Sequence, residues 1–332
     1  MQKEIKPATI SAKDGGVLFN FMKPIYEQFS KAGVPETIHA CNGFEDFARV
    51  ATQGKGNFVC DVKLPNIAPA PNNNKVLVAY TGGKDSTAEA IRLKNLGYEV
   101  HLFFIKGLNR AYPGEYESAV KIAEIIGCEM HETEVKISGK IFHPENPIKN
   151  QITLALLTDW GIANGFGKFG SGVVNAFNTN YEYNWSDTAA LMEEFKKFLR
   201  AVVPGWEYVN CNVHPESENL AEVLKHPRAK EIFALKSSCM GPHRFRKVWR
   251  ENVLKKFGVK LDENQCGLCY KCAYEYVVCS AITGKVTSQK YLSKCVETLR
   301  GKLYDQLQHK DIFEWADVTF GERIAKLVLK II

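Results

Sequence analysis

The chain has 332 residues, enough for one large domain or two smaller ones, and a net charge of +6. Its 45% hydrophobic and 24% charged residues are typical of a folded, water-soluble protein and exclude an intrinsically disordered one. The mild positive charge suits a nucleotide ligand. It permits contact with RNA but does not argue for it, because the sequence has no dense basic run.

Neither the N-terminus nor any apolar stretch indicates export or membrane insertion. Residues 1–6 lack the apolar core of a signal peptide, and no apolar run is long enough to cross a membrane. The ten cysteines of such a chain are typical of reduced thiols or metal ligands rather than of a disulfide framework. We therefore expect a cytoplasmic protein with no membrane partner.

Residues 1–74 are predicted to form an N-terminal extension. A strand and a short amphipathic helix fit within residues 15–33, and a second helix fits residues 43–50. Residues 65–74 are rich in proline and asparagine, which indicates a linker without regular structure. We predict no chemical role for this extension.

A buried parallel strand is predicted at residues 75–80, whose last five residues are Val-Leu-Val-Ala-Tyr. The glycines Gly82 and Gly83 then allow a sharp turn. A helix follows over residues 86–96 and ends at Gly97, a typical C-cap position. The stretch is therefore predicted to be a strand, a glycine turn and a helix.

This turn has the properties of a phosphate-binding site. The positive end of a helix dipole and the backbone N–H groups of the turn point at one place, where hydroxyls and Lys84 add donors. Asp85 offers a hard oxygen ligand for Mg²⁺. An ordinary turn between strand and helix, the alternative, would need neither paired glycines nor this set of side chains. The predicted nucleotide-binding residues are Tyr80, Thr81, Gly82, Gly83, Lys84, Asp85, Ser86 and Thr87.

Further strands and helices alternate after this unit. A strand at 99–105, a helix at 116–126 and a strand at 128–135 predict an α/β fold with a doubly wound parallel sheet. Ligands of such sheets lie at the C-terminal ends of the strands. We therefore expect adenine beside the end of the second strand, at Phe104, Ile105 and Lys106.

The next predicted elements carry candidates for substrate contact. A long apolar helix starts within residues 144–157, and its first turn carries Lys149 and Asn150. These two residues contact phosphate or substrate in one interpretation and are solvated polar residues in the other.

A loop at residues 178–188 is rich in asparagine and aromatic residues, and it follows a strand predicted at 172–177. Such a loop can stack a planar base, for which Trp185 is a candidate. Asp187 either binds that base or only caps the helix predicted at 189–199.

Three cysteines, Cys266, Cys269 and Cys272, follow one another at spacings of three and are typical of a metal site. Cys239 is the candidate for the fourth ligand, with Cys279 and His243 in reserve. Zn²⁺ is the expected ion, and an iron–sulfur cluster is the alternative because cysteine ligation alone does not separate the two metals.

The run Thr81-Gly-Gly-Lys-Asp-Ser86 resembles the Ser-Gly-Gly-x-Asp-Ser signature of the PP-loop ATP pyrophosphatases. The resemblance implies that ATP is cleaved between its α- and β-phosphates and that AMP is transferred to a substrate oxygen. The glycine loop would hold the departing pyrophosphate.

Together with the cysteine pattern, residues 75–280 resemble the 7-cyano-7-deazaguanine synthase family. That family implies adenylation of 7-carboxy-7-deazaguanine, amidation by ammonia and dehydration to the nitrile, with ATP, Mg²⁺ and Zn²⁺. The residues to which the resemblance assigns catalysis are Lys84, Asp85 and Lys149, and those to which it assigns deazapurine binding are Asn150, Trp185 and Asp187.

Several positions depart from the family pattern. Thr81 replaces serine, Lys149 replaces arginine, and Lys84 is more common in tRNA-thiolating relatives. Lys84 and a basic helix predicted at 244–256 support a tRNA-thiolating enzyme as the alternative. A non-catalytic nucleotide-binding assembly protein and acyl transfer to a macromolecular amine are further alternatives.

The predicted domains are the extension at 1–74, an ATP-binding α/β domain at 75–235 and a cysteine-rich helical region at 236–332. The last part, residues 304–332, is amphipathic. We expect it to pack as a helix on the body of the protein or on a second copy in a homodimer.

Overall fold

The computed structural model describes residues 9–10, 16–23, 37–40, 43–52, 54, 57–61, 63, 67–106, 114–136, 148–172, 189–210, 216–236, 239 and 243–306. The chain divides into two compact units. The first takes in Met1–Tyr80, Arg92–Ala111 and Cys128–Val213, and the second takes in Thr81–Ile91, Tyr112–Gly127 and His214–Ile332. The domain boundaries at residues 74 and 235 stay a prediction.

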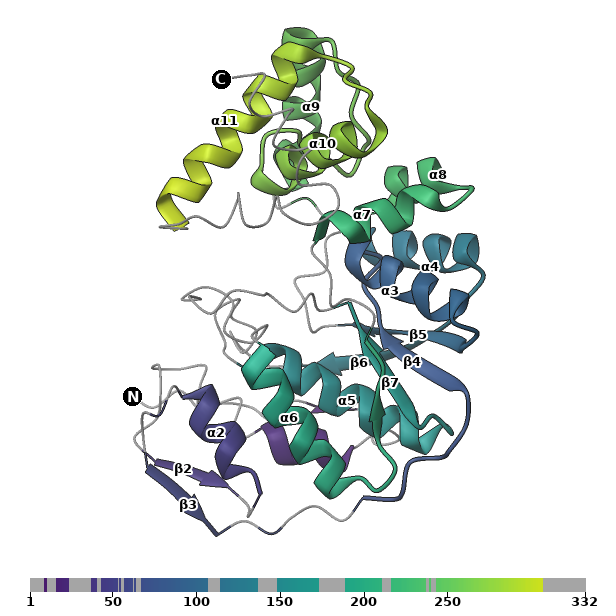
Figure 1. Cartoon of the computed structure of the whole chain (residues 1–332), viewed down its shortest axis with the longest axis vertical. Helices are drawn as coiled ribbons and strands as arrows, with labels where there is room; N and C mark the ends of the chain where they lie inside the picture. The colour runs from purple at the N-terminus through teal and green to yellow at the C-terminus, as the bar shows by residue number, and fades with distance from the viewer. Residues whose placement is uncertain are drawn as a thin grey trace. The chain divides into compact units, whose positions relative to one another are not determined.

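A mostly parallel sheet forms the centre of the first unit (Figure 1). Among the described residues its strands are, in spatial order, β1 (Thr9–Ile10), β6 (Glu129–Lys136), β5 (Glu99–Lys106), β4 (Lys75–Ala79), β7 (Lys168–Ser171) and β8 (Glu207–Tyr208). The strands from β6 to β8 are parallel, and β1 pairs antiparallel with β6. The strand order reverses between β4 and β7, and open sheets bind ligands at the C-terminal ends of strands at such a switch point.

Helices pack on both faces of this sheet. Consecutive residues of β7 point to opposite faces. On one face α5 (Lys149–Ala163) lies so close that a Cβ atom on Gly161 would be 2.4 Å from the ring of Phe169. On the other face, Leu93 of α3 (Lys84–Asn95) lies 3.6 Å from the position of a Cβ atom on Gly170. The predicted doubly wound α/β fold is therefore confirmed.

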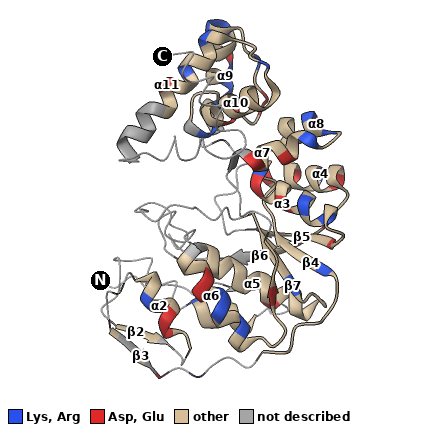
Figure 2. Cartoon of the chain, in the orientation of Figure 1, with Lys and Arg blue, Asp and Glu red and all other residues tan. Residues whose placement is uncertain are grey.

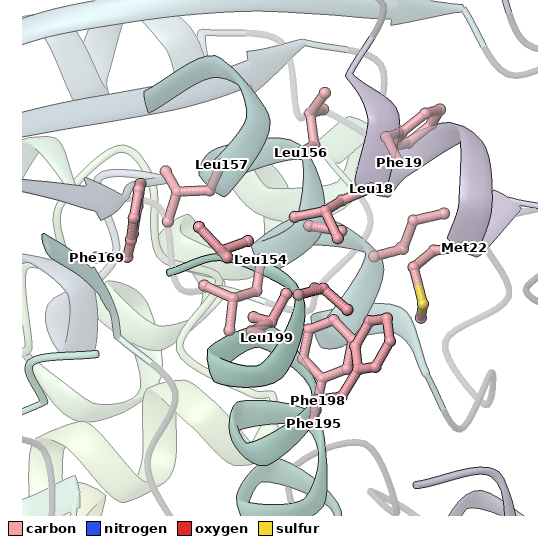
Figure 3. Close-up of a cluster of buried hydrophobic side chains, with 14 of the residues drawn as sticks. Leu18, Phe19, Met22, Leu154, Leu156, Leu157, Phe169, Phe195, Phe198 and Leu199 are labelled. Atoms are coloured by element: carbon pink, nitrogen blue, oxygen red, sulfur yellow. The ribbon is translucent and has the colours of Figure 1, made fainter. Parts of the chain in front are cut away.

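The hydrophobic core on the α5 face also includes residues from the N-terminal part of the chain (Figure 3). It joins α5, α6 (Ala189–Val202), α2 (Glu45–Ala51) and the helical residues 17–23. Phe44 packs edge-on against Phe198 of α6, with ring centroids 4.9 Å apart. The side chains labelled in Figure 3 are Leu18, Phe19, Met22, Leu154, Leu156, Leu157, Phe169, Phe195, Phe198 and Leu199. The N-terminal residues thus complete the core of the first unit.

The carboxylate of Asp159 on α5 ties the N-terminal helical residues to this core. It accepts hydrogen bonds from the backbone N–H groups of Leu18 (3.1 Å) and Phe19 (2.8 Å). A Cβ atom on Gly16 would lie 1.9 Å from a carboxylate oxygen of Asp159, so only glycine fits there. Burial outweighs these hydrogen bonds and raises the pKa of Asp159 from 3.8 to about 6.

The raised pKa of Asp159 predicts that stability falls as the pH rises from 4 to 6. Between these values the folded chain keeps a proton that the unfolded chain releases, so the stabilisation is complete below the unfolded pKa and lost above the folded one. A difference of about 2 in pKa corresponds to about 3 kcal/mol of unfolding free energy. Chemical denaturation from pH 4 to 7 should show a smaller fall with pH in Asp159→Asn than in the wild type. An Asp46→Asn variant, altered at an exposed acid, serves as control, and equal pH dependence in all three proteins would contradict the assignment.

The described part of the second unit is helical outside its loops. It contains the start of α3 together with α4 (Glu115–Ile126), α7 (Glu216–Lys225), α8 (Ala229–Leu235), α9 (His243–Phe257), α10 (Tyr270–Thr283) and α11 (Gln289–Gln306). A separate core joins α9, α10 and α11, in which Val253, Val277 and Tyr291 are buried.

Two predicted boundaries need correction. The strand predicted at 172–177 is wrong at its start, because β7 covers Lys168–Ser171 and Gly172 follows it. The length of β7 is determined by pairing with β4, from Val76 opposite Lys168 to Ala79 opposite Ser171. The helix after the glycine turn begins two residues earlier than predicted, at Lys84. Residues 173–177 and the predicted helix beyond residue 306 lie outside the described residues.

Charge on the described surface is mixed rather than gathered in one basic field (Figure 2). On α6, Lys196 pairs with Glu193 and Lys197 pairs with Glu194. In the described part of the chain, no helix combines the length and the apolar character that crossing a membrane requires. A parallel pair of short strands, β2 (Thr37–Ala40) and β3 (Asn57–Cys60), completes the described elements of the first unit.

Candidate functional site

The glycine turn after β4 needs glycine for two reasons. Gly82 has a φ of 70°, in the left-handed region that other residues rarely adopt. A Cβ atom there would also lie 2.9 Å from the backbone of Ala119 on α4. Helix α3 begins at Lys84, and the N–H group of Thr87 donates to the carbonyl oxygen of Gly83 as its first turn forms. The turn therefore directs the start of a helix, with its positive dipole end, toward the loop.

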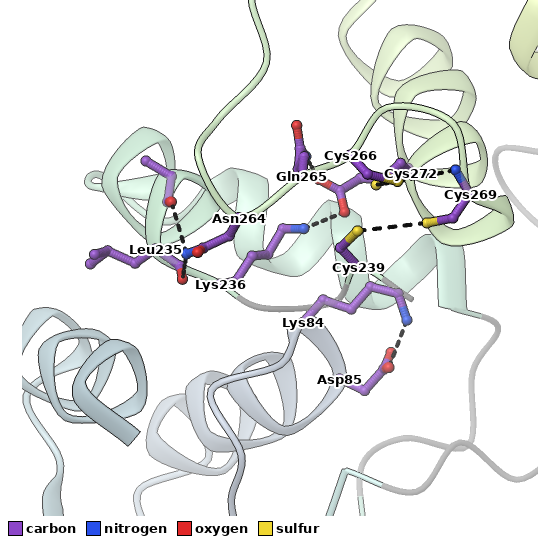
Figure 4. A network of polar contacts seen from close by, with 12 residues as sticks. Lys84, Asp85, Leu235, Lys236, Cys239, Asn264, Gln265, Cys266, Cys269 and Cys272 are labelled. Carbon is purple, nitrogen blue, oxygen red and sulfur yellow. Dashed lines mark hydrogen bonds and ion pairs between the residues drawn. The ribbon is translucent and has the colours of Figure 1, made fainter. Parts of the chain in front are cut away.

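The carboxylate of Asp85 is held from two sides in the first turn of α3, and Figure 4 shows one of them, the contact with Lys84. Its Oδ2 atom lies 2.6 Å from Nζ of Lys84, and its Oδ1 atom accepts a hydrogen bond of 2.9 Å from the amide of Asn219 on α7. Asn219 is fully buried and Lys84 is buried, whereas Asp85 is partly exposed. The arrangement holds one carboxylate in a defined orientation while leaving it accessible, which suits a Mg²⁺ ligand.

The residues predicted to lie beside adenine, at the ends of β4 and β5, differ in their burial and in their contacts. The N–H group of Tyr80 donates to the carbonyl oxygen of Phe103 (2.9 Å), and both Tyr80 and Phe104 are buried. Ile105 is half-buried, and Nζ of Lys106 lies 2.7 Å from a carboxylate oxygen of Glu132. Their assignment to adenine stays a prediction.

The predicted substrate contacts lie mostly beyond the described side chains. Lys149 and Asn150 occupy the first turn of α5, as expected, and Asn150 is half-buried. The side chain of Lys149 and the residues Trp185 and Asp187 lie outside the described part of the chain. Their proposed roles stay predictions.

The four predicted cysteine ligands come together in the second unit (Figure 4). All four sulfur atoms lie within 4.8 Å of one another, with Cys239 and Cys269 at 3.9 Å and Cys266 and Cys272 at 4.0 Å. Four sulfurs bound tetrahedrally to one zinc ion at about 2.3 Å are about 3.8 Å apart. The donor set therefore fits zinc, with Cys239 rather than the reserve ligand Cys279 in the fourth place. The side chain of His243, the other reserve, is outside the described residues.

The loop between the cysteines is shaped to approach the sulfurs. Gly267 has a φ of 74°, and a Cβ atom on it would lie 2.2 Å from Leu261. The N–H groups of Leu268 (3.4 Å) and Cys269 (3.2 Å) then point at the sulfur of Cys266. Helix α10 begins directly after Cys269, so its positive end favours thiolates at this position.

The cysteine thiols also hydrogen-bond to one another. The contacts with Cys239 and Cys272 lower the pKa of Cys266 to about 7, and the contacts with all three other cysteines, Cys239 first, lower the pKa of Cys269. The contacts with Cys266 and Cys269 raise the pKa of Cys239, and the contacts with Cys239, Cys266 and Cys269 raise the pKa of Cys272. Two of the four sulfurs are therefore disposed to lose their protons, which metal binding requires of thiol ligands.

Buried polar contacts fasten the segment that carries Cys239. Lys236 forms a buried ion pair with Glu275 of α10, and Gln265 donates to the other carboxylate oxygen of Glu275 (2.8 Å). Arg246, a buried residue of the basic helix α9, donates to the carbonyl oxygen of Cys239 (3.0 Å). Part of the charge on α9 is therefore structural, which weakens the argument that this helix binds RNA.

Sequence reasoning missed Asn219, Arg246 and Glu275 as supporting residues. Asn219 lies 134 positions from Asp85 and has no motif around it. Arg246 stands out in the sequence only as one member of a basic helix. No local signal distinguishes a polar side chain that will be buried beside a site from one that will be solvated.

Comparisons with known proteins agree with the predicted resemblance. No protein-family model matches the chain. The 7-cyano-7-deazaguanine synthase 1 of Desulfitobacterium hafniense (strain Y51) is 26% identical over 181 residues, covering 48% of this chain and 74% of that protein. The chain is thus distantly homologous to 7-cyano-7-deazaguanine synthase.

A solved structure is also similar, that of a predicted subunit of tRNA methyltransferase from Methanocaldococcus jannaschii. Its TM-score is 0.27, with 21% identity, and the match covers 41% of this chain and 67% of that chain. The fold assignment rests instead on the strand order and register of the chain itself.

Proposed function

We propose that this chain, a distant homologue of a 7-cyano-7-deazaguanine synthase, cleaves ATP to AMP and pyrophosphate and transfers the AMP to a carboxylate. The observation that carries the proposal is the glycine turn at the start of α3, with Asp85 held by Lys84 and Asn219. An ordinary turn has no need for a carboxylate oriented by a fully buried amide.

The residues of the turn have separate roles in this proposal. The backbone N–H groups of the turn and the exposed hydroxyl of Thr81 hold the departing pyrophosphate, while the hydroxyls of Ser86 and Thr87 are buried beside the turn. Asp85 ligates Mg²⁺, which supplies charge neutralisation for the phosphates when it is bound. To bind Mg²⁺ through Oδ2, Asp85 must give up its contact with Lys84. The ammonium of Lys84 then contacts a phosphate oxygen instead. The protein thereby contributes positioning and electrostatic stabilisation.

The carboxylate that we propose as substrate is 7-carboxy-7-deazaguanine. Support comes from the relative's name and from the four-cysteine cluster that accompanies the glycine loop in the resembled family. Adenylation converts the carboxylate oxygen into a good leaving group, and ammonia displaces AMP to form the amide. A second ATP would adenylate the amide oxygen, and elimination of AMP, which carries that oxygen away as the amide nitrogen loses its protons, would yield the nitrile. Lys149, Asn150, Trp185 and Asp187 are the proposed contacts to the α-phosphate and the base.

The four-cysteine cluster is proposed to hold a structural zinc ion rather than an iron–sulfur cluster. Its four sulfurs lie close enough together to hold one zinc ion and would leave no ligand position open for catalysis. The contacts around Cys239 link the cluster to α9 and α10, as a structural role requires.

The experiment that tests the substrate is mass spectrometry of a reaction with 7-carboxy-7-deazaguanine, ATP, Mg²⁺ and ammonium. We expect AMP, pyrophosphate and either the nitrile or the amide, the latter marking a reaction that stops after one adenylation. A mass increase on the protein or on added tRNA in place of these products would indicate a macromolecular acceptor. Unchanged substrate without pyrophosphate would remove deazaguanine from the proposal, and ADP with orthophosphate would overturn the ATP chemistry as well.

A further inference from the structure

A second group of metal-ligating side chains lies in the first unit, at the N-terminal ends of β5 and β6. It consists of His101, Glu129 and His131, whose donor atoms all lie within 4.8 Å of one another. Nδ1 of His101 is 3.0 Å from Nε2 of His131 and 3.5 Å from Oε2 of Glu129. Nε2 of His131 is 3.8 Å from Oε1 of Glu129. Two ring nitrogens and one carboxylate therefore converge on one point.

The register of the two parallel strands brings these residues together. His101 lies opposite Glu129, and His131 lies opposite Phe103, which is two residues beyond His101. Since alternate residues of a strand share a face, His101, Glu129 and His131 all project from the same face of the sheet. They lie at the opposite end of the strands from the edge where such sheets bind nucleotides.

The spacing of the donor atoms fits a divalent transition-metal ion. Ligand atoms at about 2.0–2.1 Å from one zinc ion are about 3.3 Å apart at tetrahedral angles. The three distances between the donor atoms, 3.0, 3.5 and 3.8 Å, lie on both sides of this value. A hydrogen bond between the two rings would account for the shortest distance alone and not for the carboxylate beside both nitrogens. Two histidines and one glutamate also form a known zinc-ligand set, in which a fourth position stays open to water.

A carboxylate outside the group orients one of its rings. Nε2 of His101 lies 3.0 Å from Oε1 of Glu99, which in turn pairs with Lys75 at 3.3 Å. With its hydrogen on Nε2, His101 directs the lone pair of Nδ1 toward His131 and Glu129. Metal-binding histidines commonly donate their second N–H group to a carboxylate in this way.

Aromatic packing holds the rings in place at the end of α5. Phe166 packs edge-on against His101 at 4.9 Å, and Trp160 packs against His131 at 5.0 Å between ring centroids. His101 is only 8% exposed, whereas the side chain of Glu129 is 66% exposed and leaves access from solvent. The C-terminal end of a helix carries a partial negative charge, which favours a cation near it.

We propose that His101, Glu129 and His131 bind one divalent transition-metal ion such as Zn²⁺, with Glu99 as a positioning residue for His101. The ion links the N-terminal ends of β5 and β6 and stabilises the first unit. This site is separate in the chain from the four-cysteine cluster and does not depend on the proposed ATP chemistry.

The test is calorimetric titration of the full chain with Zn²⁺ after the four-cysteine cluster has been filled with its metal under reducing conditions. We expect the wild type to bind one further equivalent and to unfold at a higher temperature when it does. His131→Phe keeps an aromatic ring against Trp160 but removes the ligand nitrogen, so the affinity should fall at least about 100-fold. Glu99→Gln should weaken binding about 10-fold, through the orientation of His101.

His39 provides a matched control, because it pairs with Asp61 alone at 2.7 Å and belongs to no three-residue group of this kind among the described residues. His39→Phe should leave the second equivalent unchanged. If His131→Phe does not fold, Glu129→Gln, altered at an exposed side chain, removes a ligand with little effect on packing. A wild type that takes up no second equivalent, or a Glu129→Gln or His131→Phe protein that binds it with unchanged affinity, would overturn the proposal.

Discussion

Replacing Asp85 by asparagine is expected to lower the rate of pyrophosphate release about 1,000-fold while leaving the fold intact. The new side chain would keep one oxygen toward Asn219 but lose the charge that holds Mg²⁺ and balances Lys84. A 1,000-fold loss corresponds to about 4 kcal/mol of transition-state stabilisation, a typical effect of removing one well-placed electrostatic group. The measurement is pyrophosphate release with ATP, Mg²⁺ and the carboxylate substrate, alongside thermal unfolding.

Two further variants test whether the loss of activity comes from the position of Asp85 rather than from the removal of a negative charge as such. Asp46→Asn changes the same residue type in the first turn of another helix, α2, and should keep full activity. Asn219→Ala removes only the hydrogen bond to Oδ1 of Asp85, so we expect a smaller loss, about 10-fold, and a weaker apparent affinity for Mg²⁺. Unaltered pyrophosphate release by Asp85→Asn would contradict the role of this carboxylate.

The elements around the glycine turn could be predicted because their signals are local. The apolar run of β4, the paired glycines and the periodicity of α3 are each contained within a few residues. The cysteine cluster was predictable for a similar reason, since three of its ligands share a span of seven residues. Cys239 lies outside that span and was one of three candidates for the fourth place, beside Cys279 and His243. The structure brings its sulfur together with the other three.

Features that depend on distant partners could not be predicted in this way. The short strand β7 has a glycine and a lysine among its four residues and is a strand because β4 pairs with it. Asn219 is functional in our proposal only because α7 places it against Asp85. The group of His101, Glu129 and His131 arises from the register of two parallel strands, which no spacing along the chain reveals.

Removing the metal from the four-cysteine cluster is expected to unfold the α9–α11 region while the sheet of the first unit stays folded. The buried residues Cys239, Cys266 and Cys272 form a small core against which Trp249 packs. The hydroxyl of Tyr291 on α11 donates a hydrogen bond of 2.7 Å to the carbonyl oxygen of Gly267, in the loop between the cysteines. Structural zinc in small thiolate sites contributes about 10–16 kcal/mol of binding free energy, which is as large as the whole stability of a typical domain. Without that contribution, buried thiolates would repel one another or take up protons.

Hydrogen exchange measured by mass spectrometry can follow the two units separately. After chelation, or in Cys266→Ser, the amides of α9, α10 and α11 should lose most of their protection, whereas those of β4, β5 and β6 should keep it. Elemental analysis should show one metal ion per chain fewer in the variant than in the wild type. A visible absorption spectrum then separates colourless zinc from an iron–sulfur cluster, the alternative that would favour a tRNA-thiolating activity.

Cys295→Ser is the matched control for this experiment, since Cys295 is a buried cysteine of the same unit that lies outside the cluster. Burying a hydroxyl in place of its thiol should destabilise the protein by about 1–3 kcal/mol without any loss of metal. If chelation left the protection of α10 unchanged, the cluster would not be the structural centre of this region. The contacts of Lys236, Glu275 and Arg246 would then suffice to hold the segment of Cys239 in place.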